Sequence, residues 1–126
     1  MDNKIKFPQF KLEVFFSGKV EAFGHMILFF PKKRVDNIKA TFDGNLRNSN
    51  LHLKEEYFDG NLKIKRIWIF KKTANNDYIG YEKSVKGSIK VHSRDNILEM
   101  SYKFNTHYKC FNFLVNIRDY MYLIDD

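Results

Sequence analysis

An arginine placed among apolar residues is the feature of this sequence most able to bind another group. The stretch 59–71 opens with the turn pair Asp-Gly and then alternates, so that Arg66 and Trp68 share one side of an extended strand. Trp68 is the only tryptophan of the chain. The same side carries three further apolar residues, namely Leu62, Ile64 and Phe70. The stretch therefore predicts a strand whose apolar face holds one cation.

Two interpretations of Arg66 follow, because a guanidinium is costly to bury unless it is paired or stacked. In the functional one, Arg66 receives the carboxylate or phosphate head group of a ligand inside an apolar cup. In the structural one, it packs on Trp68 and is bonded to a carboxylate or to strand-end carbonyls, with Glu55, Glu56 and Asp119 as candidate partners. The structural interpretation is the more common outcome for an arginine in such a place.

Other residues that catalysis or metal binding would use are scattered. Cys110 is the only cysteine, which excludes an intrachain disulfide and favours a half-buried structural thiol. Glu55 and Glu56 are adjacent, so a strand points them to opposite faces. No phosphate loop, nucleophile elbow or HExxH motif is present. None of the four histidines has another His or Cys at metal-ligand spacing: His25, His52, His92 and His107. We expect no catalytic residue, no metal and no cofactor, and hence no enzyme.

The net charge of +7 and a sequence pI of about 9.4 admit nucleic acid or an anionic membrane surface as a partner. We attribute most of this excess to solvated lysines on the outward faces of strands and to a composition rich in Lys, Ile, Asn and Phe. Nucleic-acid binding would require exposed aromatics beside lysines, as Tyr57, Tyr78 and Tyr81 could be. Aromatics at strand spacing are more often core, so nucleic acid is the least favoured partner.

The elements that must position these residues are mainly strands. The length of 126 residues indicates one domain, and the aromatic share of 17% favours strands. We expect an extended N-terminal lead-in over 1–11 and a single β-barrel domain over 12–126. The apolar block at 10–16 fits either one helical turn that plugs a barrel end or the first strand.

Alternation and turn residues predict seven strands, over 19–30, 35–42, 46–58, 62–71, 78–92, 97–104 and 107–117, the third with an interruption near Arg47-Asn48-Ser49-Asn50. The expected turns include Asp43-Gly44-Asn45, Asp59-Gly60 and Asn105-Thr106. Gly24 lies inside a strand, where it indicates a bulge or a sharp bend. No segment of ten residues has a helical stripe. Successive hairpins make an antiparallel up-and-down barrel the simplest topology.

Several motifs carry a family resemblance when they are taken in order. The chain has F-S-G-K-V-E-A-F-G at 16–24 and R-D-Y-M-Y-L at 118–123, with Arg66-Ile67-Trp68, Tyr78-Ile79-Gly80 and Val85-Lys86-Gly87 between them. They are similar to domain-of-unknown-function family thirty-eight thirty-three, a bacterial family described as lipoproteins with a D-D-W-M-Y-L signature. The resemblance covers roughly residues 10–126.

This resemblance implies a lipocalin-like, calycin-type β-barrel with no assigned activity, and it supplies no catalytic residues. The sequence departs from the family at Phe23 and Tyr120, where Trp is usual, at Arg118, where an acidic residue is usual, and at Ser84, where Asp is usual. The lipobox of many relatives is absent. Relatives continue with a further strand pair, so the chain looks truncated at its C-terminus and the barrel incomplete, with an unpaired edge.

We therefore expect a non-enzymatic, lipocalin-like module that binds a small apolar or amphipathic, lipid-like ligand. Leu62, Ile64, Trp68 and Phe70 would line the cup and Arg66 would hold the head group. The alternatives are a structural or interaction protein with a filled barrel, or the remnant of a truncated gene. Without a secretion signal or lipobox the chain is nominally cytoplasmic, although relatives look envelope-associated. Peripheral membrane contact, the compartment and the oligomeric state stay open.

Overall fold

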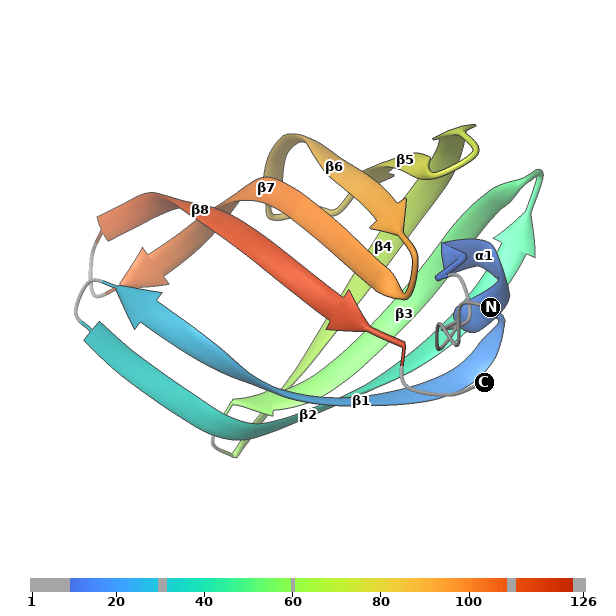
Figure 1. Cartoon of the computed structure of the whole chain (residues 1–126). Helices are drawn as coiled ribbons and strands as arrows, with labels where there is room; N and C mark the ends of the chain where they lie inside the picture. The colour runs from blue at the N-terminus through green and yellow to red at the C-terminus, as the bar shows by residue number, and fades with distance from the viewer. Residues whose placement is uncertain (1–9, 30–31, 60, 109–110, 124–126) are drawn as a thin grey trace, which may run out of the picture.

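The fold is a single antiparallel sheet that curls into a half-barrel (Figure 1). The computed structural model describes residues 10–29, 32–59, 61–108 and 111–123. One helical turn precedes eight strands, which follow one another in sequence order: α1 (Leu12–Phe15), β1 (Gly18–Phe29), β2 (Lys32–Arg47), β3 (Asn50–Asp59), β4 (Leu62–Ala74), β5 (Asp77–Tyr81), β6 (Val85–Arg94), β7 (Ile97–Tyr108) and β8 (Phe111–Tyr122). The predicted all-β, up-and-down architecture is confirmed.

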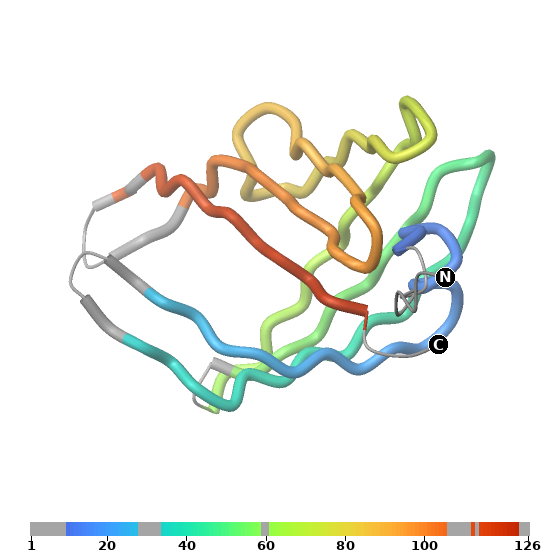
Figure 2. Tube along the Cα trace, viewed as in Figure 1, coloured from blue at the N-terminus to red at the C-terminus, as the bar shows by residue number. Residues whose placement is uncertain are grey.

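The half-barrel is open along one side. Each strand pairs antiparallel with the next, and within the described residues β1 and β8 pair only with β2 and β7. Figure 2 shows these two strands, blue and red, as separate edges of the curled sheet. The predicted incompleteness of the barrel is therefore confirmed. No helix in the described ranges is long and apolar enough to cross a membrane.

The N-terminal apolar block closes one end of the half-barrel as a helical turn, so the first of its two predicted alternatives is the correct one. Phe10, Leu12 and Phe16 are each at most 1% exposed. The ring of Phe16 meets that of Phe42 on β2 edge-on at 5.2 Å. The Phe10 N–H donates to the Asp95 carbonyl at 2.7 Å, which fastens the block to the β6–β7 turn. We call this the plugged end: residues 10–16 with the buried strand residues Phe42, Leu51, Phe70, Tyr78, Val91 and Leu98.

The predicted turn at Asp43-Gly44-Asn45 is wrong, because β2 runs straight through it. Gly44 pairs with Leu53 on β3, and a Cβ at Gly44 would lie 1.6 Å from the Phe16 carbonyl oxygen. The glycine is needed for this close approach of the plug and not for a turn. The chain turns instead at Asn48 and Ser49, whose φ values are 51° and 68°. Asparagine tolerates such left-handed conformations, as hairpin turns require.

The predicted strand over 78–92 is also wrong, because it consists of β5 and β6 with a tight turn between them. The Glu82 carboxylate accepts a hydrogen bond from the Ser84 N–H at 2.7 Å, and the Val85 N–H donates to the Glu82 carbonyl at 3.0 Å. This turn contains neither glycine nor proline, so its amino-acid composition does not indicate a turn. A side chain that bonds to the backbone two residues later forms the turn instead.

The predicted turn at Asn105-Thr106 is wrong as well. β7 and β8 pair without a register shift from Ile97 opposite Tyr122 to Tyr108 opposite Phe111. The Asn105 N–H also donates to the Ser84 carbonyl at 2.7 Å. The twelve consecutive cross-strand pairs between β7 and β8 outweigh the local turn propensity of Asn105-Thr106. The bulge predicted at Gly24 is confirmed by a register shift between Gly24 and Met26, whereas Cys110 lies outside the described residues.

Candidate functional site

The predicted central strand β4 lies along the inner wall of the half-barrel, as its alternation requires. Its inward residues become more deeply buried along the strand, from half-buried Ile64 and Arg66 to Trp68 at 9% and Phe70 at 2% exposure. Leu62 begins the strand and is 66% exposed. The five residues predicted to line a cup thus share one face, but only the first three offer much surface to a ligand.

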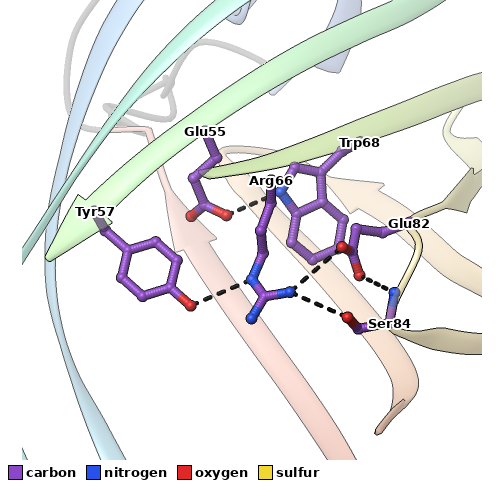
Figure 3. A network of polar contacts seen from close by, with 6 residues as sticks. All are labelled: Glu55, Tyr57, Arg66, Trp68, Glu82 and Ser84. Carbon is purple, nitrogen blue, oxygen red and sulfur yellow. Dashed lines mark hydrogen bonds and ion pairs between the residues drawn. The ribbon is translucent and has the colours of Figure 1, made fainter. Parts of the chain in front are cut away.

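Arg66 is held by Tyr57 on one side of its guanidinium and by Glu82 and Ser84 on the other (Figure 3). Its Nε donates to the Tyr57 hydroxyl at 3.2 Å, and its Nη1 donates to Glu82 Oε1 at 3.3 Å and to Ser84 Oγ at 3.4 Å. Its guanidinium carbon lies 4.4 Å from the centre of the Phe104 ring. The Arg66 and Glu82 side chains are 18% and 4% exposed. This is a partly buried ion pair with additional hydrogen bonds, as the structural interpretation of Arg66 expects.

The partner of Arg66 is one that the sequence does not reveal. The candidates were Glu55, Glu56 and Asp119, and Glu55 does lie directly opposite Arg66 in the β3–β4 register. Glu82 takes the guanidinium instead, since the β5–β6 turn folds over the inner wall. Burial alone would lower the pKa of Arg66, but the hydrogen bond to Tyr57 and the charge of Glu82 outweigh it and raise that pKa. Arg66 therefore remains a cation.

One nitrogen of Arg66 keeps a free bonding capacity. Its Nη2 donates to no described residue, and Figure 3 shows it without a dashed line. Within the described ranges no fully buried side-chain nitrogen or oxygen lacks a hydrogen-bond partner. The Nη2 group must therefore retain contact with solvent, and a further acceptor could reach it there.

Trp68 anchors a second polar contact on the same wall. Its Nε1 donates to Glu55 Oε1 at 2.9 Å. The indole stacks on Phe70 with an interplanar angle of 9° and meets Tyr102 on β7 edge-on, with ring centres 5.8 Å apart. The aromatic wall thus spans β4 and β7, and it holds the Glu55 carboxylate against the indole.

A third carboxylate faces the same interior. The Tyr102 hydroxyl donates to Asp119 Oδ2 on β8 at 2.7 Å. Burial raises the pKa of Asp119, and burial together with the negative charges of Asp119 and Glu82 raises that of Glu55. Burial and the charge of Asp119 likewise raise the pKa of Tyr102. Three carboxylates therefore lie on the inner wall together with one guanidinium, and burial raises the pKa of two of them, Glu55 and Asp119.

Some of these residues were detectable in the sequence and others were not. Tyr102 has the same strand parity as Leu98 and Met100, which marks it as inward. Asp119 lies on an inward position of β8, but its contact with Tyr102 requires the three-dimensional register. Glu82 and Ser84 lie in a turn that was taken for strand. No alternation places a turn residue over the opposite wall, so sequence reasoning missed both.

The histidines and acidic residues of the described segments form no group of three that could hold a metal ion. His92 bonds through Nδ1 to Asp77 Oδ1 at 2.7 Å on the outer surface. His25 is exposed and His52 is half-buried. A groove lies on the outer face, and none of the five predicted cup residues lines it.

Comparison with known proteins bears on the family. The sequence model of a family described as "Protein of unknown function (DUF3833)" matches residues 1–126. Neither the curated proteins nor the solved structures contain a match. The match covers the whole chain and agrees with the resemblance that the motifs at 16–24 and 118–123 predicted.

Proposed function

Because the chain belongs to the DUF3833 family, whose function is unknown, we propose a role from the geometry of its inner wall. The half-barrel is a non-enzymatic module that binds a small amphipathic ligand at the end opposite the plug. We call this the open end and define it by its inward, half-buried residues: Tyr57, Ile64, Arg66, Tyr102, Phe104 and Ile117. Leu62 belongs to its rim.

The observation that carries this proposal is incomplete burial of an apolar wall. At the plugged end, inward residues such as Phe70 and Leu98 are at most 2% exposed. At the open end, inward aromatics such as Tyr57 and Phe104 keep part of their surface accessible. Apolar surface that the fold itself leaves uncovered favours an apolar ligand, at about 25 cal/mol for each Å² removed from water.

Arg66 supplies the head-group contact in this proposal. Its Nη2 retains solvent contact, while Glu82 and Tyr57 fix the orientation of the guanidinium in advance. A pre-oriented guanidinium suits a carboxylate or phosphate. The ligand tail would lie against Ile64 and the rim, above a floor of Trp68 and Phe70.

The test uses the intrinsic fluorescence of Trp68. The chain is titrated with three amphiphiles of equal tail length that carry a carboxylate, a trimethylammonium or a hydroxyl head. We expect a saturable change in emission, with the carboxylate binding most tightly. Arg66→Met should weaken binding of the carboxylate about tenfold, the lower end of the range for a hydrogen bond to a charged group, and leave binding of the alcohol unchanged. Lys63→Met on the outer face of β4 is the matched control.

Two outcomes would overturn this assignment. No emission change with any amphiphile would reject ligand binding at the open end. Equal affinity for the three head groups, unaffected by Arg66→Met, would leave an apolar site but remove the role of Arg66.

A second candidate function, an interaction protein, has one observation in its favour. In the described residues the outer edges of β1 and β8 have no pairing strand. Unpaired edges are templates for strand addition. Chemical cross-linking across a concentration series would distinguish this role, because strand addition would give a defined complex in the absence of any amphiphile.

A further inference from the structure

The outer surface of β5–β8 carries a group of exposed cations that form no ion pair with any described residue. Strand alternation places the apolar residues of β6 and β7 inward and leaves their charged neighbours exposed. We call this surface the outer face. Its exposed cations come from three strands: Lys86, Lys90 and Arg94 on β6, Lys103 on β7 and Arg118 on β8.

The strand register sets these cations side by side. Lys86 lies directly opposite Lys103, and Ser101 lies between Lys90 and Arg118 in the next row. Like charges directly opposite one another on a sheet destabilise it. A bound anion would relieve this repulsion, whereas a purely structural surface gains nothing from the arrangement.

On the other half of the sheet some cations are ion-paired, whereas Lys19, Lys54 and Lys71 pair with no described residue. On β1–β4, Lys39 lies 3.6 Å from Glu21, and Glu56 lies 3.2 Å from Lys63 and 3.8 Å from Lys65. None of the five outer-face cations forms an ion pair with any residue that the structure describes.

The outer face has two carboxylates of its own. Asp77 is already bonded to His92, and Glu99 lies opposite His92. The strands of the outer face therefore present five exposed cations against these two carboxylates.

Two of the cations line a groove that also holds aromatic surface and the carboxylates Asp77 and Glu99. The groove has a volume of about 490 Å³, and Lys90, Arg118 and Tyr120 are among its lining residues. Tyr120 is 52% exposed, and two further tyrosines of this face, Tyr81 and Tyr122, are 51% and 63% exposed. Tyr122 lies in the cross-strand row next to that of Tyr120.

We propose that the outer face binds single-stranded nucleic acid, independently of the open end. Unpaired lysines and arginines beside exposed aromatic rings suit a chain that carries phosphates and flat bases alternately. The phosphates would contact Lys90, Arg118 and the Lys86–Lys103 pair. A base would stack on Tyr120. A membrane surface fits less well, because polar and charged side chains outnumber the two aliphatic ones, Val91 and Met100, in the lining of the groove.

The test measures binding of fluorescently labelled oligothymidylate and oligouridylate by anisotropy over a range of salt concentrations. Four phosphate contacts predict a slope of log K against log salt of about −2.8, at about −0.7 for each contact on a single strand. Lys90→Ala with Arg118→Ala should make that slope shallower by about 1.4. Lys63→Ala with Lys65→Ala removes the same charge from the ion-paired half and should change the slope far less.

Tyr120 variants separate base recognition from charge. Tyr120→Ala should weaken oligonucleotide binding about tenfold, within the range for one stacked base, and Tyr120→Phe should keep it. Inorganic polyphosphate lacks bases, so its binding should not respond to Tyr120→Ala. All substituted side chains are exposed, and thermal unfolding of each variant checks that the fold is kept.

Three results would overturn the proposal. The first is no oligonucleotide binding at low salt. The second is equal loss of binding in the outer-face and Lys63/Lys65 variants, which would indicate unspecific attraction. The third is binding to vesicles with an anionic phospholipid but not to oligonucleotides, which would assign the face to a membrane.

Discussion

The two ends of the half-barrel are built from the same strands but differ in what those strands hold. At the plugged end, α1 seals a core of aromatic and aliphatic side chains. At the open end, the inner wall carries Arg66 and three carboxylates. Even the acidic residues differ. Burial alone would raise the pKa of Glu13 in α1, but hydrogen bonds from Tyr78 and Lys72 outweigh it and lower that pKa, whereas the pKa values of Glu55 and Asp119 are raised.

The contrast assigns stabilisation of the fold mainly to the plugged end and ligand recognition to the open end. A lowered pKa means that the surroundings stabilise the charged form of the carboxylate, which is typical of a structural contact. A raised pKa means that the surroundings destabilise the charged form of the carboxylate. Such groups concentrate where a protein binds a ligand or catalyses a reaction. The plugged end should therefore dominate the free energy of unfolding, and the open end should dominate any response to a ligand.

The largest expected effect is loss of the plug. Phe16→Ala should lower the free energy of unfolding by about 3–5 kcal/mol, because a fully buried ring is replaced by a cavity. Phe104→Ala at the open end should cost only about 1–2 kcal/mol, because its ring is already part-exposed. Chemical denaturation of the two variants gives the comparison. Equal losses would mean that the open end is as tightly packed as the plugged end.

A pair of glycines provides the next test. Gly44→Ala should cost about 2–3 kcal/mol, because the new Cβ would meet the Phe16 carbonyl and force the plug to move. Gly24→Ala on β1 meets nothing within 4 Å and should be neutral or stabilise the fold by about 0.5 kcal/mol. Thermal unfolding of both variants is the measurement. A tolerated Gly44→Ala would show that the plug can shift without loss.

The ion pair at the open end should have a smaller effect. Glu82→Gln should cost about 2 kcal/mol, since it removes a charged partner of Arg66 and weakens the bond to the Ser84 N–H. Glu56→Gln removes an exposed salt bridge and should cost at most about 0.5 kcal/mol. Urea denaturation at neutral pH compares the two. If both variants match the wild type, the Arg66 cluster does not constrain the fold.

The smallest expected effect is a dependence of stability on pH that differs between the ends. Glu55 and Asp119 have raised pKa values in the folded state. They therefore contribute most to the free energy of unfolding below their ordinary pKa values near 4, and this contribution is lost as the pH rises through the raised pKa values. Glu55→Gln with Asp119→Asn should therefore flatten the loss of stability toward neutral pH.

Glu13 has the opposite sign. Its lowered pKa contributes stability above the ordinary value near 4, and that stability is lost as the pH falls. Glu13→Gln should thus remove acid sensitivity and leave the neutral side unchanged. Denaturant midpoints from pH 3 to pH 8 measure both effects. Parallel pH profiles for the two variants would contradict the distinction between the ends.

Much of the fold was accessible from the sequence, because alternation and burial coincide along most strands. The face of β4 with Trp68 and Phe70, the inward row of β7 and the bulge at Gly24 all follow from side-chain period and missing side chains. The errors occurred where a glycine served packing, as at Gly44, and where a turn used side-chain hydrogen bonds, as at Glu82. Neither role has a compositional mark.

The candidate site was harder to predict from the sequence than the fold, because its contacts join residues of different elements. The inward direction of Arg66 is a property of one strand, which alternation gives. Its pairing with Glu82 is a property of how far the β5–β6 turn folds over the wall, which depends on the curl of the sheet. The five unpaired cations of the outer face likewise become a surface only once the registers of β6, β7 and β8 are known.

The fastening of residue 10 to the β6–β7 turn has a consequence for the order of folding. Every strand pairs with its neighbour in sequence, so the hairpins have low contact order and can form rapidly, one after another. The plug is different, because Ser93 donates to the Phe10 carbonyl across 83 positions. It can dock only after β6 and β7 exist. Until then the inner apolar wall is uncovered, and this interval is when the nascent chain is most prone to aggregate.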